Sequence, residues 1–338
     1  MLDYYQALNP QNWQGRTDSL AYERFFQIVQ CIDLQHDNIN TIPPHSIVLL
    51  GFACDTGVIR NAGRAGAAQG PRALRCALSN LTLAQFATPE NIIIYDIGDI
   101  VCPDDNLEAA QTTLASLITQ CLIQQCQPIV LGGGHEIAWG HYQGIAGANQ
   151  HASLGIINID AHFDLRPLSQ PNYGTSGTPF LQIAHHCQQQ QNAFRYLCLG
   201  IQPFSNTRSL FTTAQQLNTH YLLAHNLRPE LLADNLNYVQ QFVDSCDHIY
   251  LTLCMDSFAA NIAPGVSAPQ AAGIYPWQLE PLLDIILRSH KVAHFDVAEL
   301  APPLDRDNMT AQLAAYYVAK VLTRYSLHTR KREKPLSP

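Results

Sequence analysis

The chain has 338 residues, 47% of them hydrophobic, and is therefore long enough to bury one large α/β core or two smaller ones. Its formal net charge of −8 at pH 7 argues against a nucleic acid or an anionic membrane as a partner, and none of its apolar runs reaches the roughly 18 residues of a membrane span. The ten cysteines are scattered without a CxxC pair and the first residues lack a secretory signal, so we expect reduced thiols and a cytoplasmic protein.

Residues 1–45 mix a short helical pattern with polar linker, and they are predicted to form an N-terminal arm packed on the body. In residues 46–328, apolar β-rich runs alternate with helical segments, and nothing in the composition divides this stretch. We therefore expect one α/β domain with three layers, α/β/α, around a central, mostly parallel sheet of eight strands. Residues 329–338 are predicted to be a flexible tail. The eight runs are residues 47–52, 92–97, 129–131, 154–159, 196–201, 220–223, 249–253 and 292–297.

Chemically useful side chains follow the run at 154–159. Asp160, His162 and Asp164 come at a spacing of two, so in an extended chain they share a face and can point into one pocket. Two carboxylates and an imidazole at such short range repel or desolvate one another unless a cation lies among them. A metal site is therefore the leading interpretation.

Other runs should end in polar residues too, because ligands of parallel sheets bind beyond the carboxyl ends of the strands. Three of them do. One ends in glycines and His135, another ends in Cys254 and Asp256, and the last is followed by Glu299. Since burying unpaired polar groups is costly, we expect these side chains to meet at one site.

Three of these motifs resemble the metal-binding signatures of the ureohydrolase (arginase/agmatinase) family. They stand in the family's order and at family-like separations, and the resemblance covers roughly residues 46–325. Any one of them would be a weak signal, whereas the three together are highly specific. The motifs are Gly133-Gly134-His135-Glu136, Asp160-Ala161-His162-Phe163-Asp164, and Cys254-Met255-Asp256 followed by residues 263–269.

Within that family the chain is most similar to the formimidoylglutamase group. The resemblance implies an arginase-like fold, in which residues 46–328 would be the catalytic domain, and it also implies a homo-oligomer acting on a small molecule. The features that favour this group are residues 13–18, 60–67, 164–166 and 176–180.

The resemblance further implies a centre of two manganese ions. By this likeness His135 would bind one ion and His162 the other, and Asp160 would bridge them. Asp164 would complete the shell of the first ion and Asp256 that of the second.

Cys254 stands where the family has a second bridging carboxylate. A thiolate is softer than a carboxylate and favours zinc or iron over manganese, although a metal ion can deprotonate a thiol outright. Three states stay open: two ions with Cys254 as a thiolate ligand, two ions with Cys254 merely lining the site, and a single tightly held ion. A small buried strand residue is the plainer interpretation of the same cysteine.

Ser176 stands where arginases and agmatinases carry a histidine, so the family's usual proton shuttle is missing. We expect Ser176 to line the substrate site instead. His141, His185 and His186 are available, although their positions suit ordinary helix or surface histidines. Asp164, hydrogen-bonded to the attacking hydroxide, is the preferred base and then acid.

Glu299 resembles the family's amidine-holding glutamate and would pair with the substrate nitrogens through charge-assisted hydrogen bonds. Arg166 follows the second motif, where its fork of donors could grip a substrate carboxylate and would repel the cationic tail of agmatine. The plainer interpretations are a helix N-terminal residue for Glu299 and a surface salt bridge for Arg166.

The resemblance thus implies hydrolysis of N-formimidoyl-L-glutamate to L-glutamate and formamide, a step of histidine breakdown, by attack of a metal-activated hydroxide on the amidine carbon. One alternative is another amidine or guanidine hydrolase, such as guanidinobutyrase, agmatinase or arginase. The other is a metal-poor family member that binds a ligand without catalysis.

Overall fold

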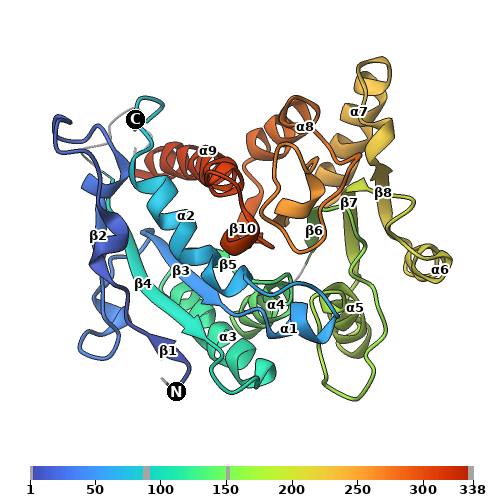
Figure 1. The fold of residues 1–338 in the computed structure, drawn as a ribbon, viewed down its shortest axis with the longest axis horizontal. Helices are drawn as coiled ribbons and strands as arrows, with labels where there is room; N and C mark the ends of the chain where they lie inside the picture. The colour runs from blue at the N-terminus through green and yellow to red at the C-terminus, as the bar shows by residue number, and fades with distance from the viewer. Residues whose placement is uncertain (1–2, 87–91, 150–152, 334–338) are drawn as a thin grey trace, which may run out of the picture.

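The computed structural model describes residues 3–86, 92–149 and 153–333 of the chain. A ten-stranded sheet runs through the molecule in the order β1-β4-β3-β5-β10-β9-β6-β7-β8, with β2 paired to β4 beside this path. All of its pairings are parallel except that of β1 with β4 (Figure 1). The strands are β1 (Tyr5–Gln6), β2 (Val29–Cys31), β3 (Ile47–Ala53), β4 (Ile94–Val101), β5 (Gln127–Gly132), β6 (Leu154–Ile159), β7 (Arg195–Ile201), β8 (His220–Leu223), β9 (His248–Cys254) and β10 (Val292–Ala298).

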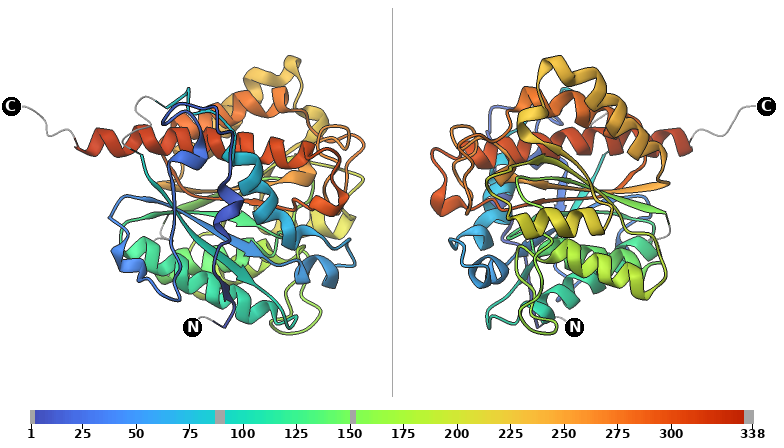
Figure 2. Two further views of the ribbon diagram at one scale, coloured as in Figure 1. Left: turned by 60° about the vertical axis from the view of Figure 1, so that its left-hand side comes forward. Right: turned by 90° about the vertical axis from the view of Figure 1, so that its right-hand side faces the viewer.

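Helices cover both faces of the sheet, as Figure 2 shows. Helices α2, α7, α8 and α9 pack into a core on one face, and α3, α4, α5 and α6 pack into a second core on the other. Successive side chains of a strand point to opposite faces of the sheet, so each strand contributes to both cores. Leu49 of β3 packs in the first core, and Val48 and Leu50 pack in the second. The helices are α1 (Thr56–Arg60), α2 (Gly70–Ser79), α3 (Leu107–Ile123), α4 (Ile137–Gly147), α5 (Pro179–Gln189), α6 (Arg208–Gln216), α7 (Leu232–Asp244), α8 (Pro276–Arg288) and α9 (Met309–Glu333).

The three-layer, mostly parallel α/β/α architecture predicted from the sequence is confirmed, and the eight predicted runs correspond to β3–β10. The sheet has ten strands rather than eight because the N-terminal segment adds β1 and β2 at its edge. These strands have two and three residues, too few to show an alternating pattern.

The N-terminal segment is tied to the body by a buried polar cluster. The indole Nε1 of Trp13 donates to Asp96 at 2.8 Å, and the same carboxylate accepts from Nε and Nη2 of Arg75 at 2.7 and 2.9 Å. Arg75 and Asp96 are fully buried, so this cluster fixes where the segment docks.

At the other end of the chain, α9 continues to Glu333, past residue 329 where the tail was expected to begin. Arg330, Lys331 and Arg332 are good helix formers, and extending an existing helix is far easier than starting one. The last five residues of the expected tail, 334–338, lie outside the described residues. Among the described residues, no helix combines the length and the apolar character that a membrane crossing requires.

Candidate metal centre

The candidate site lies where the four central strands end. β5, β10, β9 and β6 are consecutive neighbours in the sheet, and their registers place Leu131 beside Val297, Ala298 beside Cys254, and Leu253 beside Ile159. The carboxyl ends are therefore level, and the residues after each strand reach the same rim. This is the place where parallel α/β sheets bind their ligands.

Three of these connections need unusual backbone. Gly133, just after β5, lies very close to the backbone that follows β3. A Cβ at this position would be 1.9 Å from the carbonyl oxygen of Cys54. Asp164 and Glu299 both adopt the left-handed conformation, with φ of 48° and 66°. Such strain in non-glycine residues persists only where the surrounding structure enforces it, and it gathers at functional sites.

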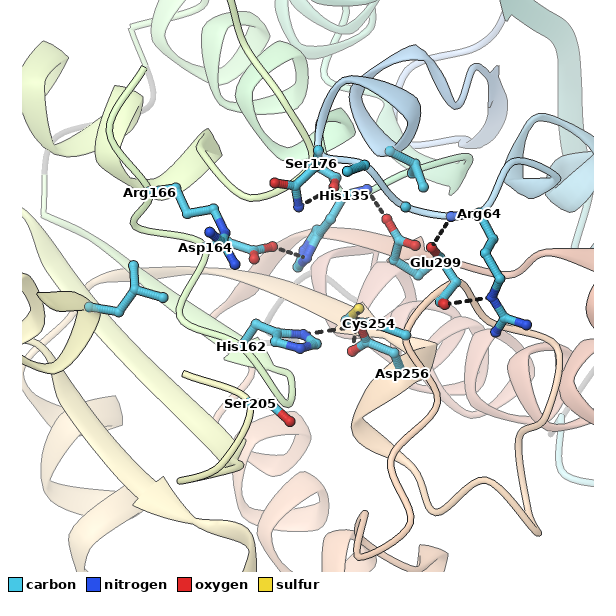
Figure 3. A pocket seen from close by; sticks show the side chains of 17 residues that line it. Arg64, His135, His162, Asp164, Arg166, Ser176, Ser205, Cys254, Asp256 and Glu299 are labelled. Atoms are coloured by element: carbon cyan, nitrogen blue, oxygen red, sulfur yellow. Dashed lines mark hydrogen bonds and ion pairs between the residues drawn. The ribbon is translucent and has the colours of Figure 1, made fainter. Parts of the chain in front are cut away.

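A first group of possible ligands consists of His135, Asp160 and Cys254, whose ligand atoms all lie within 4.8 Å of one another. Nδ1 of His135 is 2.9 Å from Oδ2 of Asp160. It is also 2.9 Å from Oδ2 of Asp164 (Figure 3). The structure thus brings Asp164 to this group through a turn, since β6 ends at Ile159 and the chain bends at residues 160–162. The extended chain assumed for this motif is not what unites its side chains.

A second group consists of Asp160, His162 and Asp256, again within 4.8 Å of one another. Nδ1 of His162 lies 3.1 Å from Oδ2 of Asp256 and 3.5 Å from Oδ1 of Asp160. The thiol of Cys254 donates to Oδ1 of Asp256 at 2.9 Å. Asp160 belongs to both groups, and Cys254 touches both, so the two groups form one continuous cluster.

The charges of this cluster shift the pKa values of its members strongly. Burial alone would lower the pKa of His135 and of His162, but the carboxylates around them raise both well above the usual value. Burial alone would raise the pKa of Asp160, yet the two imidazoles lower it. Burial and the charge of Asp160 raise the pKa of Asp164 to about 6 and also raise that of Asp256. The carboxylates of the cluster therefore need nearby positive charge to balance them.

The donor set fits divalent metal ions. Nδ1 of His135 is buried and has no partner in hydrogen-bonding geometry among the described residues, although two carboxylate oxygens are 2.9 Å away. Nitrogen and oxygen atoms that face a common point without aligned hydrogen bonds suit a shared cation. The sharing of Asp160 by two groups suits a pair of ions. Oxygen and nitrogen ligands suit manganese, and the sulfur of Cys254 adds a softer donor.

A pocket of ≈ 360 Å³ opens above the cluster. Glu299 is 5% exposed, and its Oε1 accepts the backbone N–H of His135 at 2.9 Å. Burial, together with neighbouring carboxylates, raises the pKa of Glu299 well above its usual value. No helix begins at this residue, so the interpretation of Glu299 as a helix N-terminal group does not apply.

Arg166 and Ser176 line the same pocket. No salt bridge joins the guanidinium of Arg166 to a carboxylate within the described ranges of the chain. Ser176 accepts a hydrogen bond from Nδ2 of Asn61 at 3.2 Å, and its backbone N–H donates to the carbonyl of Gly57. The serine is thereby fixed at the pocket wall.

The three histidines considered as alternative proton donors lie elsewhere. His141 is completely buried in α4, where its Nδ1 is 2.7 Å from Oδ2 of Asp296. It is thus neither a surface residue nor a lining residue of the pocket. His185 and His186 line a different hollow, beside α5 and the loop of residues 167–172.

Sequence reasoning gave no role to several residues at the site. Arg64, Asn61, Ser205 and Ser267 line the pocket from loops, and Thr252 lies behind His135, with its Oγ1 3.0 Å from Nε2. Asn61 and Arg64 belong to the motif of residues 60–67, which carries part of the family resemblance. That motif is the sequence signal that points to them.

Comparison with known proteins assigns the chain to a family. The family model described as the arginase family matches residues 45–323. The chain belongs to the arginase family. Among relatives in this family, the formimidoylglutamase of Legionella pneumophila (strain Philadelphia 1) is 44% identical over 321 residues, covering 95% of this chain and 98% of the relative. That of Vibrio vulnificus (strain YJ016) is 44% identical over 329 residues, with coverages of 93% and 95%.

Solved structures of arginase-family proteins share the fold. Formiminoglutamase of Trypanosoma cruzi, crystallised with Mn²⁺, is similar with a TM-score of 0.74 and 25% identity, covering 83% of this chain and 93% of that one. Formimidoylglutamase of Bacillus subtilis gives a TM-score of 0.77 at 23% identity, with coverages of 92% and 95%.

Proposed function

We propose that this arginase-family protein is a hydrolase acting on a C–N bond of a linear amidine, and that it converts N-formimidoyl-L-glutamate to L-glutamate and formamide in histidine breakdown. The observation that carries the proposal is the position of Arg166 in the wall of a pocket whose floor is a cluster of metal-ligand side chains. Its guanidinium has no carboxylate partner among the residues that the structure describes. Relatives named formimidoylglutamase at 44% identity over nearly the whole chain support it.

Two Mn²⁺ ions are the proposed cofactor. His135 and Asp164 would hold one, His162 and Asp256 the other, and Asp160 would lie between them. Cys254 is proposed as the second shared ligand, in place of a carboxylate. If this thiol governs the metal preference, the site would bind zinc or iron in place of manganese, or only a single ion. When bound, the ions supply an acidified water and stabilise negative charge that develops on the substrate.

The protein's own residues would orient the substrate and move the proton. Glu299 accepts hydrogen bonds from the amidine nitrogens, and its burial makes that charge-assisted pairing strong. Arg166 binds a carboxylate of the substrate, and Ser176, fixed by Asn61, borders the same space. Asp164 takes the proton of the attacking water and returns it to the leaving amine.

We further propose that the protein works as a homo-oligomer in the cytoplasm on a small-molecule substrate, without a nucleic acid or membrane partner. All ten cysteines are free thiols, which fits a reducing compartment.

Steady-state kinetics on a panel of amidines and guanidines tests the function. The panel contains formimidoylglutamate, 4-guanidinobutyrate, agmatine and arginine, each assayed after loading with manganese, zinc or iron. We expect the largest kcat/KM for formimidoylglutamate. Faster turnover of agmatine or arginine would contradict the assignment. A protein that retains no transition metal and stays inactive after metal addition would instead be a non-catalytic family member.

A further inference from the structure

Two arginines, not one, line the pocket above the cluster. Arg166 and Arg64 lie on opposite sides in Figure 3, with His135, His162 and Glu299 between them. Arg166 belongs to the loop after β6, whereas Arg64 belongs to the loop between α1 and α2. In a chain whose net charge is −8, the presence of two arginines in the lining of one pocket needs a specific explanation.

Arg64 is held in place by neutral acceptors. Its Nε donates to the carbonyl of Ser267 at 2.9 Å and its Nη2 to the carbonyl of Val266 at 2.7 Å. Its backbone N–H donates to Oγ of Ser267 at 2.8 Å. These bonds orient the guanidinium without neutralising it, and no carboxylate lies within 4.0 Å in the part of the chain that the structure describes. Donors on Nη1 are left for a ligand.

Arg166 is likewise positioned but not neutralised. Its backbone N–H donates to the carbonyl of Gly177 at 2.8 Å. Its aliphatic stem lies directly against that glycine, where a Cβ would be 2.7 Å from Cδ. The side chain is therefore supported along its stem, and in the described part of the chain no carboxylate pairs with its guanidinium.

We propose that Arg64 and Arg166 each bind one of the two carboxylates of the substrate, so that the pocket selects a dicarboxylate amidine. The inference rests on the proposed function and deepens it. Glu299 pairs with the single positive charge of the substrate, the amidinium, and the arginines pair with its two negative charges. Each charge of formimidoylglutamate then meets an opposite charge, whereas a monocarboxylate or a cationic amidine leaves at least one guanidinium unpaired.

Two substrate analogues separate the carboxylates. N-formimidoyl-4-aminobutyrate lacks the α-carboxylate, and N-formimidoyl-L-norvaline lacks the γ-carboxylate while keeping the length of the side chain. Arg64→Gln and Arg166→Gln remove the charge but keep an amide donor, which for Arg64 can still serve the carbonyls of Val266 and Ser267. Arg288→Gln, on α8 and outside the pocket lining, is the control for loss of one arginine.

With formimidoylglutamate, each pocket variant should lower kcat/KM by about 10- to 100-fold, the range expected for a lost hydrogen bond to a charged group. With the analogues, each variant should lose activity on one and be nearly unchanged on the other, and the two arginines should differ in which analogue is spared. Arg64→Lys, which keeps the charge without the fork, should restore part of the activity. Metal content and thermal midpoint are measured for every variant, so a loss of the centre or the fold is recognised.

Equal losses by Arg64→Gln on all three substrates, with metal content retained, would assign Arg64 to support of the loop at residues 266–268 and would overturn the inference. No loss at all would do the same. In both cases wild-type hydrolysis of formimidoylglutamate leaves the proposed function standing. A wild-type protein that prefers a cationic amidine would overturn both.

Discussion

Oγ1 of Thr252 lies 3.0 Å from Nε2 of His135, so this nitrogen contacts the threonine while Nδ1 faces the metal-ligand cluster. When Nδ1 gives its lone pair to a metal ion beside Asp160 and Asp164, the remaining proton of the imidazole is on Nε2 and is donated to the threonine. Thr252 is fully buried in β9, in register with Asp296 of β10, so the hydroxyl cannot turn away to solvent. The metal-facing tautomer of His135 is thus set from behind the site.

Replacing Thr252 by valine should therefore weaken metal binding. The change keeps the shape of the side chain but removes the partner of Nε2, and losses of outer hydrogen bonds to metal ligands lower affinity by about 10- to 100-fold. Competition with a chelator measures the Mn²⁺ affinity directly. Thr252→Ser, which restores the hydroxyl, should bind Mn²⁺ nearly as the wild type does. Equal affinity of the valine variant would show that Thr252 does not orient His135.

Cys254 should reveal itself as a ligand by spectroscopy. A protein loaded with Co²⁺ is expected to show an intense near-ultraviolet thiolate-to-cobalt band, which Cys254→Asp and Cys254→Ser should both lose. Because a carboxylate is the harder ligand, Cys254→Asp should also bind Mn²⁺ at least as tightly as the wild type and preserve or raise manganese-dependent activity. If the wild type lacks the band, or if the variants change neither metal content nor rate, the thiol merely lines the site.

The parts of the site that the sequence predicted are those carried by strand ends. The position of an apolar run in a parallel sheet fixes where the next residues emerge, which is why Asp160 and Asp256 could be assigned to one rim. Arg64 was missed because its place depends on how the loop after α1 folds back against residues 266–267, and no local pattern encodes that contact. Thr252 was missed because a threonine in a strand looks like any other β-former.

Metal binding should release protons and should strengthen as the pH rises. The carboxylates around His135 and His162 raise the pKa values of both imidazoles well above the usual value, which favours their protonated forms when no ion is bound. An ion must displace these protons. Calorimetric titration with Mn²⁺ in two buffers of different ionisation enthalpy should show proton release, and the affinity should be greater at pH 8 than at pH 6. Binding without proton release would contradict the protonated cluster.

The raised pKa values of His135 and His162 also predict that the metal-free protein becomes less stable as the pH rises above neutral. A histidine whose pKa is higher in the folded state than its unfolded value of about 6.5 stabilises the fold fully below that value. This contribution is lost as the pH rises through the raised folded pKa. Urea unfolding of the metal-free protein should therefore show a falling free energy of unfolding above neutral pH, and Mn²⁺ should reverse the fall. A stability that rises with pH in this range would contradict the prediction.

Docking of the N-terminal segment should depend on the buried carboxylate of Asp96. Arg75→Met leaves Asp96 without its bidentate partner in a fully buried place, and breaking such a pair costs about 3–5 kcal/mol. Trp13→Phe removes only the indole donor while Arg75 still satisfies the carboxylate, so the cost should be about 1–3 kcal/mol. Arg16→Gln, which breaks an exposed ion pair with Asp18, should leave the free energy of unfolding nearly unchanged. Urea unfolding of the metal-loaded proteins measures all three, and an Arg75 variant no less stable than the Arg16 control would show that this cluster does not hold the N-terminal segment to the sheet.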